Sequence, residues 1–200
     1  MKITLPENIS DITLEQFQKY HELMIREDLT DKQKNDRKIS IFIGLNHKQA
    51  CDIASLDYND ILKQIDISLN QTVEFKNRFK IKDVEFGFIP NFDEITQGEF
   101  IDMKSYEIGI DKMHNLMAVL FRPIKNKDPF GNYTIVDYNG TKEFSDVMKN
   151  MPLSIVNGAL IFFLNLSNEL MNHTLRYTRE EQPKEAQQKN TLKSGDGTQL

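Results

Sequence analysis

The residues best suited to chemistry are two histidines, each close in sequence to a thiol or a carboxylate. His47 and Cys51 are four residues apart, so a helix would hold them on one face, as half of a metal site or as a thiol–imidazole pair. His114 follows Asp111 by three residues, a spacing that suits a general base oriented by a carboxylate. A zinc site needs further ligands and the chain has one cysteine, so we expect structural roles for these side chains.

Acidic residues recur over a stretch that a hydrolase or a metal-dependent nuclease could use as paired carboxylates. They are Glu85, Asp93, Glu94, Glu99 and Asp102. Glu99 stands three residues after Thr96, where it would cap a helix, and the two preceding acids suit the polar entry to that helix. The chain has no Gly-rich phosphate loop, H-E-x-x-H, G-x-S-x-G or C-x-x-C motif. We therefore expect no catalytic residue, no metal site and no cofactor.

Four basic residues alternate with aromatic and apolar residues in one short stretch. They are Lys76, Arg78, Lys80 and Lys82. On a strand all four would share one face, so this stretch is the best local candidate for contact with nucleic acid or with an acidic partner. The alternative is the solvated face of a half-buried hairpin whose phenylalanines belong to the core. We favour that alternative because the net charge of −5 leaves no wide basic field behind the stretch.

Arg122 is a further candidate contact residue, at the end of an apolar helical pattern and just before Pro123. Its guanidinium would complement the negative C-terminal end of that helix. It would otherwise pair with an acidic residue of the hairpin or of residues 93–102. Both roles are structural.

The elements that carry these residues begin with an all-helical block over residues 1–71. Capping boxes at Thr13 and Thr30 predict helices that start at these residues, the first over about 14–27. Ser55 caps a further helix with inward apolar residues at helical spacing.

A different pattern starts at residue 72 and runs to 177, as a continuation of the same domain. Apolar residues at every second position predict a β-hairpin that turns near Ile81–Asp83. After it we expect a helix from about residue 108 that Pro123 ends, a polar turn over 124–131 and a short strand. Pro152 then opens the most apolar helix of the chain. The predicted fold is mainly α with a small antiparallel β-hairpin or sheet insertion, of the α+β class.

Residues 178–200 form a polar arm without apolar periodicity. Its cations, which four acidic residues nearly balance, are further candidate contact residues: Arg179, Lys184, Lys189 and Lys193. Such an arm cannot bury enough apolar surface to fold alone, so we expect it to be disordered or bound to a partner.

The composition narrows the class of protein. In 200 residues, 39% are hydrophobic and 28% charged, which excludes a wholly disordered chain. A single cysteine excludes a disulfide framework, and no apolar run is long enough for a membrane span. The first residues lack an apolar signal core, so we expect a soluble protein made in a cytoplasm.

Three stretches of the sequence together resemble a known group of proteins. They are Phe86–Asp102, Met113–Ile124 and Met151–Phe163. Their order is similar to small proteins encoded by tailed bacteriophages of Bacteroidetes hosts, including crAss-like gut phages. The resemblance covers about residues 70–170, half of the chain, and carries over no catalytic residue.

The resemblance implies a non-enzymatic role in the architecture or assembly of a phage particle. The chain would be a virion component, near the portal and tail or packaged inside, made in the host cytoplasm. Its partners would be other phage structural proteins and copies of itself. A non-virion tail assembly chaperone is the alternative within this class. A small metal-dependent enzyme and a nucleic-acid-binding module are remoter alternatives from other classes.

Overall fold

The computed structural model describes residues 5–45, 49, 55–107, 109–163 and 165. The chain divides into two units, Met1–Ala159 and Leu160–Leu200, and all the labelled helices and strands belong to the first unit. This unit combines helices with a four-stranded antiparallel sheet, which confirms the predicted α+β class. His47, Cys51 and the cations of the arm over 178–200 lie outside the described residues.

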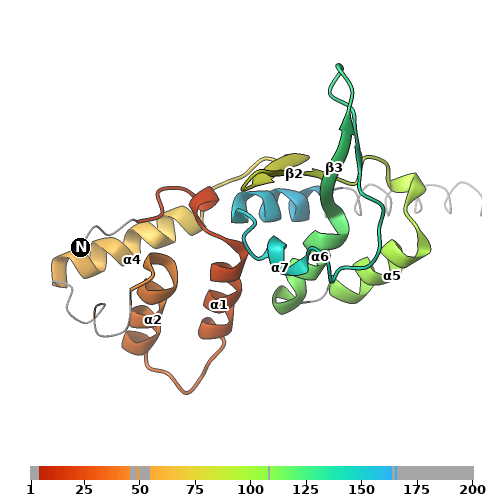
Figure 1. Cartoon of the computed structure of the whole chain (residues 1–200). Coiled ribbons are helices and arrows are strands. Elements are labelled where there is room, and N and C mark those ends of the chain that lie inside the picture. Colours follow the sequence, from red (N-terminus) through yellow and green to blue (C-terminus); the bar gives the residue numbers. More distant parts are fainter. Residues whose placement is uncertain (1–4, 46–48, 50–54, 108, 164, 166–200) are drawn as a thin grey trace, which may run out of the picture. The chain divides into compact units, whose positions relative to one another are not determined.

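The first part of this unit is helical, as predicted. Its helices are η1 Ile9–Asp11, α1 Leu14–Met24, α2 Asp31–Ile43 and α4 Ser55–Leu69 (Figure 1). Both predicted capping boxes are present, at Thr13 and Thr30. The helix α1 ends at Met24, three residues earlier than predicted. Just after this end, Arg26 Nε donates a hydrogen bond to Asp28 Oδ1 at 2.9 Å. Residues two apart do not face each other on a helix, so this pair favours a turn.

The sheet has the order β1-β2-β3-β4. Its strands are β1 Arg78–Ile81, β2 Val84–Phe88, β3 Phe121–Lys127 and β4 Tyr133–Ile135. The predicted hairpin is confirmed, because β1 and β2 pair with Phe79 opposite Phe86 and with Ile81 opposite Val84 across a two-residue turn.

Two predictions between residues 108 and 131 are wrong. The helical segment consists of η3 Ile110–Lys112 and α6 Met113–Leu120, and strand β3 follows it without a loop, so Pro123 lies inside a strand. Residues 124–127 belong to β3 and pair with β4, where a polar turn was expected. The outer part of this hairpin is exposed on both faces, so it lacks the apolar alternation by which a strand is recognised.

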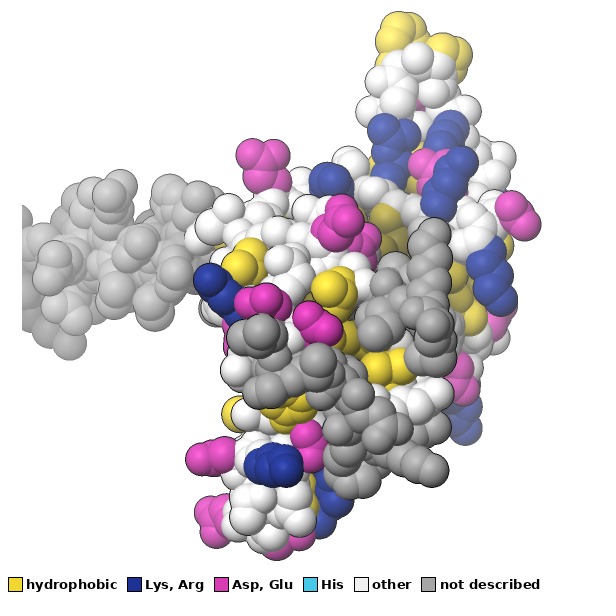
Figure 2. Space-filling view, turned by 90° about the vertical axis from the view of Figure 1, so that its left-hand side faces the viewer, with side chains coloured by type: hydrophobic (Ala, Val, Ile, Leu, Met, Phe, Trp, Pro, Cys, Tyr) yellow, Lys and Arg dark blue, Asp and Glu magenta, His cyan; other side chains and the backbone are white. Residues whose placement is uncertain are grey.

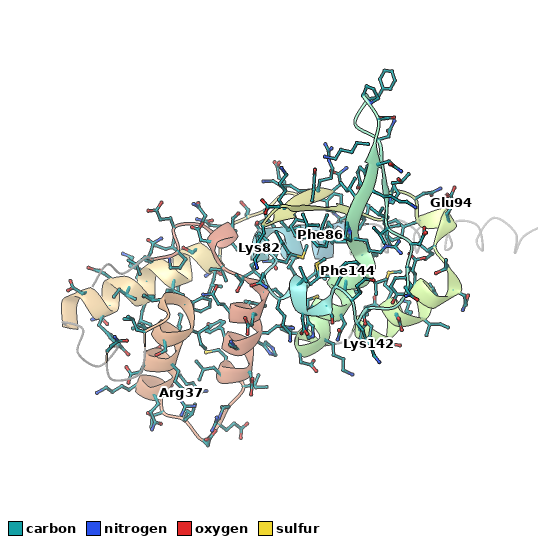
Figure 3. All side chains as sticks on the ribbon, viewed as in Figure 1. Arg37, Lys82, Phe86, Glu94, Lys142 and Phe144 are labelled. Atoms are coloured by element: carbon teal, nitrogen blue, oxygen red, sulfur yellow. The ribbon has the colours of Figure 1, made fainter. Side chains whose placement is uncertain are left out.

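One face of the sheet carries the aromatic core of the unit. Phe121 contacts Phe79 and Phe88, with ring centroids 5.2 and 5.0 Å apart. Phe86 meets Phe144, which precedes α7 Ser145–Met148, at 6.2 Å (Figure 3). These edge-on arrangements are the ones aromatic rings prefer.

Residues 153–159 of the first unit are helical, as predicted for the apolar segment after Pro152. A β-bridge joins Thr13 to Pro152, and the amide of Leu153 donates to the carbonyl of Ile12 at 2.8 Å. Within 153–159, Gly158 approaches the backbone of residues 74–75 so closely that a Cβ would lie 2.7 Å from the Glu74 carbonyl oxygen. No helix among the described residues is long and apolar enough to cross a bilayer.

Candidate interaction surface

The four basic residues of the first hairpin do not share one strand face, contrary to expectation. Arg78 and Lys80 lie on β1, whereas Lys76 precedes the strand and Lys82 lies in the turn with a φ of +52°. The pairing of the two strands ends at Arg78 and Gly87, and the amide of Phe88 donates to the carbonyl of Asn77 just before β1. All four basic side chains are exposed, and Phe79 between them is buried, as in the hairpin interpretation.

The outer face of the sheet is built around Gly87. Its cross-strand partners are Arg78 on β1 and Arg122 on β3, so both cations start from this face. The ring of Tyr133 lies over Gly87, where a Cβ would be 2.4 Å from a ring carbon, and its hydroxyl donates to the Phe88 carbonyl at 2.9 Å. The Arg78 guanidinium sits 5.9 Å from the centroid of that ring. The outer face is therefore an ordered surface.

Two further lysines extend this surface along β3. A register shift between Ile124 and Asn126 brings Lys127 onto the same side as Ile124, where it pairs with Glu85 of β2. The hydrogen bond from Lys127, helped by Lys80 and Arg78, holds the pKa of Glu85 below its ordinary value. A hollow of about 410 Å³ between the strands also includes Lys125.

We call the resulting surface the basic face. It consists of Arg78, Lys80, Lys82, Lys125 and Lys127. Asp83 and Glu85 are the carboxylates that line the hollow with Lys125 and Lys127, in a chain whose net charge is −5. Figure 2 shows such dark blue side chains along the projecting hairpin of β3 and β4. Lys125 and Lys127 were missed in the sequence because they fall in the supposed polar turn.

Arg122 is buried and takes no part in the basic face. Its Nη2 lies 2.5 Å from Glu99 Oε1, and both side chains are at most 8% exposed. The expectation that it ends a helix is wrong, because α6 stops at Leu120; its pairing with an acid of residues 93–102 is confirmed. Glu99 belongs to α5 Gln97–Tyr106, which follows the short helix η2 Phe92–Glu94. The pair joins α5 to the sheet.

Glu99 is held in place by a third residue, as the capping pattern predicts. Its Oε2 accepts hydrogen bonds from the amide and hydroxyl of Thr96, at 2.6 and 2.7 Å. Burial by itself would raise the pKa of Glu99, but the bonds from Thr96 and the charge of Arg122 outweigh burial and lower it. The carboxylate therefore remains ionised as the partner of a buried guanidinium.

A hollow of about 350 Å³ lies beside this pair and includes Glu94, Thr96 and Tyr138. The Arg122 guanidinium sits 5.4 Å from the centroid of the Tyr138 ring, and the Tyr138 hydroxyl donates to Asp102. Burial, followed by the Asp102 carboxylate, raises the pKa of Tyr138. Among the described residues the Arg122 Nε has no hydrogen-bond partner.

His114 lies elsewhere, beside α1. Its Nδ1 is 3.1 Å from the side-chain nitrogen Nε2 of Gln18. Burial of the imidazole, together with the positive charge of Lys149, lowers the pKa of His114. It does not line the hollow that contains Glu94 and Glu99, so the geometry expected of an acid–base site is not formed there. In the described part of the chain, no group of three His, Cys, Asp or Glu side chains could hold a metal ion.

Comparisons with protein-family models, with curated proteins and with solved structures found no significant match for this chain.

Proposed function

We propose that this chain is a non-enzymatic structural protein of a tailed bacteriophage particle, associated with the portal or tail or packaged inside. It is made in the host cytoplasm and works in the virion through contacts with other phage structural proteins and with copies of itself. The arm over residues 178–200 adds to these contacts by becoming ordered on binding.

The basic face is the observation that carries this proposal. The buried charges near it, Arg122 and Glu99, neutralise each other and stabilise the fold. The hairpins of the same sheet instead expose five cations beside Asp83 and Glu85, in a chain that is acidic as a whole. A surface of this kind favours contact with an acidic protein surface and opposes wrong partners.

Quantitative mass spectrometry of purified particles, from the phage that encodes the chain, tests the proposal. A fixed copy number in the particles is the expected result. Absence from particles whose assembly nevertheless requires the chain would favour the tail assembly chaperone. Absence together with normal assembly of a deletion strain would contradict both roles.

The polar arm gives a second test. Deletion of residues 178–200 should leave the melting curve of the remaining protein unchanged and should reduce its copy number in particles. Unchanged incorporation would remove the arm from the contacts.

A further inference from the structure

Phe130 is the most exposed large hydrophobic residue among those the structure describes. Its side chain is 91% exposed, whereas the next, Ile25, is 65% exposed. It lies in the loop between β3 and β4, at the end of the hairpin that projects from the sheet (Figures 1 and 2). An aromatic residue in this position has a large apolar area available for a partner.

The loop that carries Phe130 has a fixed conformation. Asp128 Oδ1 accepts hydrogen bonds from the amides of Phe130 and Asn132, at 2.9 and 2.8 Å. The Asn132 side chain donates to the other carboxylate oxygen at 2.6 Å, and Gly131 provides the positive φ of +90° that the turn requires. Pro129 restricts the chain further. Binding through Phe130 therefore orders little additional backbone, which lowers its entropic cost.

The same chain also offers a hollow in which an apolar side chain could be seated. It has a volume of about 750 Å³ and lies between α1 and residues 109–111. Its apolar residues are Ile110 and the exposed Ile25. Gln18 fixes the two sides by donating to the carbonyls of Ile110 and Asp111, at 2.6 and 3.0 Å.

The charges around the two features are complementary. Lys125 lies on β3, the strand that leads to Phe130, and makes no ion pair with a described residue, whereas Lys127 of the same strand pairs with Glu85. The hollow is bordered by Glu22 and Asp111, which make no ion pair with any described residue. Its lysines are already engaged, Lys19 by Glu15 within the hollow and Lys149 by Asp146.

We propose that copies of this chain bind one another by insertion of Phe130 of one copy into the α1 hollow of the next, with Lys125 facing Glu22 and Asp111. The inference rests on one part of the proposed function, namely that copies of this chain contact one another. The hairpin tip and the hollow are different surfaces, so the contact is head-to-tail and builds a ring or an open filament. One aromatic anchor gives a weak contact, which repetition in an assembly strengthens.

Sedimentation velocity of the full chain over a range of concentrations tests this contact. The wild type should associate, and Phe130→Ala and Ile25→Lys should each require at least tenfold higher concentrations to do so. Ile67→Ala is the matched control, since Ile67 is 50% exposed on α4 and does not line the hollow, and it should behave as wild type. Melting curves of all variants should coincide, because the three side chains are exposed.

Mixing the two variants separates a head-to-tail contact from other contacts. Phe130→Ala retains the hollow and Ile25→Lys retains the tip, so the mixture should form one-to-one dimers that do not grow further. A wild type that remains monomeric up to about 1 mM, or a mixture that does not dimerise, would overturn the proposal. The proposal would also be overturned if Phe130→Ala left self-association unchanged but abolished binding to anionic lipid vesicles or to single-stranded DNA. Phe130 would then contact a lipid or a nucleic acid and not a second copy of the chain. Since the sedimentation uses purified protein alone, its failure is distinct from absence of the chain from particles.

Discussion

Arg122 and the cations of the basic face belong to the same sheet and have opposite roles. Arg122 is buried and is matched by Glu99, which Thr96 in turn holds at the start of α5. The five cations of the basic face are exposed and only partly matched by carboxylates. A charge that is fully desolvated must be paired to be tolerated, whereas a solvated excess of one sign remains available to a partner. Sequence position alone does not distinguish the two.

The largest effect should follow from breaking the buried pair. Glu99→Ala leaves a guanidinium buried without its carboxylate, and we expect a loss of about 3–5 kcal/mol in the free energy of unfolding. The double variant Arg122→Met/Glu99→Leu removes both charges and should lose much less. Urea denaturation measures both. Equal losses in the single and double variants would show that packing, and not the unpaired charge, is responsible. Lys127→Ala on the basic face is the exposed counterpart and should leave the denaturation midpoint nearly unchanged.

A smaller effect should come from Gly87, which lies under the Tyr133 ring on the outer face. Gly87→Ala should cost about 1–3 kcal/mol, because the new methyl group displaces a hydrogen-bonded ring. Gly98→Ala is the control, since Gly98 lies in α5 and a Cβ added there would meet no atom closer than 3.9 Å, and it should be neutral or stabilising.

The Gly87 effect can be tested for its cause. In a Tyr133→Ala background the added methyl group meets no ring, so Gly87→Ala should lose most of its cost. If the cost persists, the outer face is not organised by Tyr133.

The pH dependence of stability should report on Glu99 of the buried pair. Because the folded-state pKa of Glu99 is lowered, its contribution is present above the unfolded-state pKa, about 4.3, and is lost as the pH falls through the folded-state pKa. The wild type should therefore lose stability below about pH 4.5 more steeply than Arg122→Met/Glu99→Leu. Denaturation midpoints at several pH values check this, and parallel profiles would contradict the assignment to Glu99.

The smallest effect on stability should be that of Lys80→Glu. Lys80 is exposed on β1, so its reversal should change the free energy of unfolding by no more than about 0.5 kcal/mol. A larger loss would indicate that the basic face supports the fold, and the contrast with Arg122 would then weaken.

The sequence predicts elements well where capping and apolar periodicity agree. Thr13, Thr30 and Thr96 mark helix starts because their hydrogen bonds are local. It fails at β3, where Phe121 leaves the helix because its ring packs between Phe79 and Phe88, residues distant in the chain.

The candidate site shows the same limit. The sequence predicts that Arg122 could pair with an acidic residue of 93–102. It does not predict that the pair is buried, because burial depends on tertiary packing. The predicted polar turn over 124–131 contains Phe130, but its place at the tip of a β-hairpin follows only from the pairing of β3 with β4. The place of Lys125 and Lys127 on the basic face depends on strand β3 and on its register shift.

The most direct test of a contact function is the copy number of a basic-face variant in purified particles. The variant Arg78→Glu/Lys80→Glu reverses two exposed cations, and it should be compared with wild type in particles produced under the same conditions. We predict a reduced copy number with an unchanged melting curve. Wild-type incorporation of this stable variant would contradict the claim that the protein acts through its basic face.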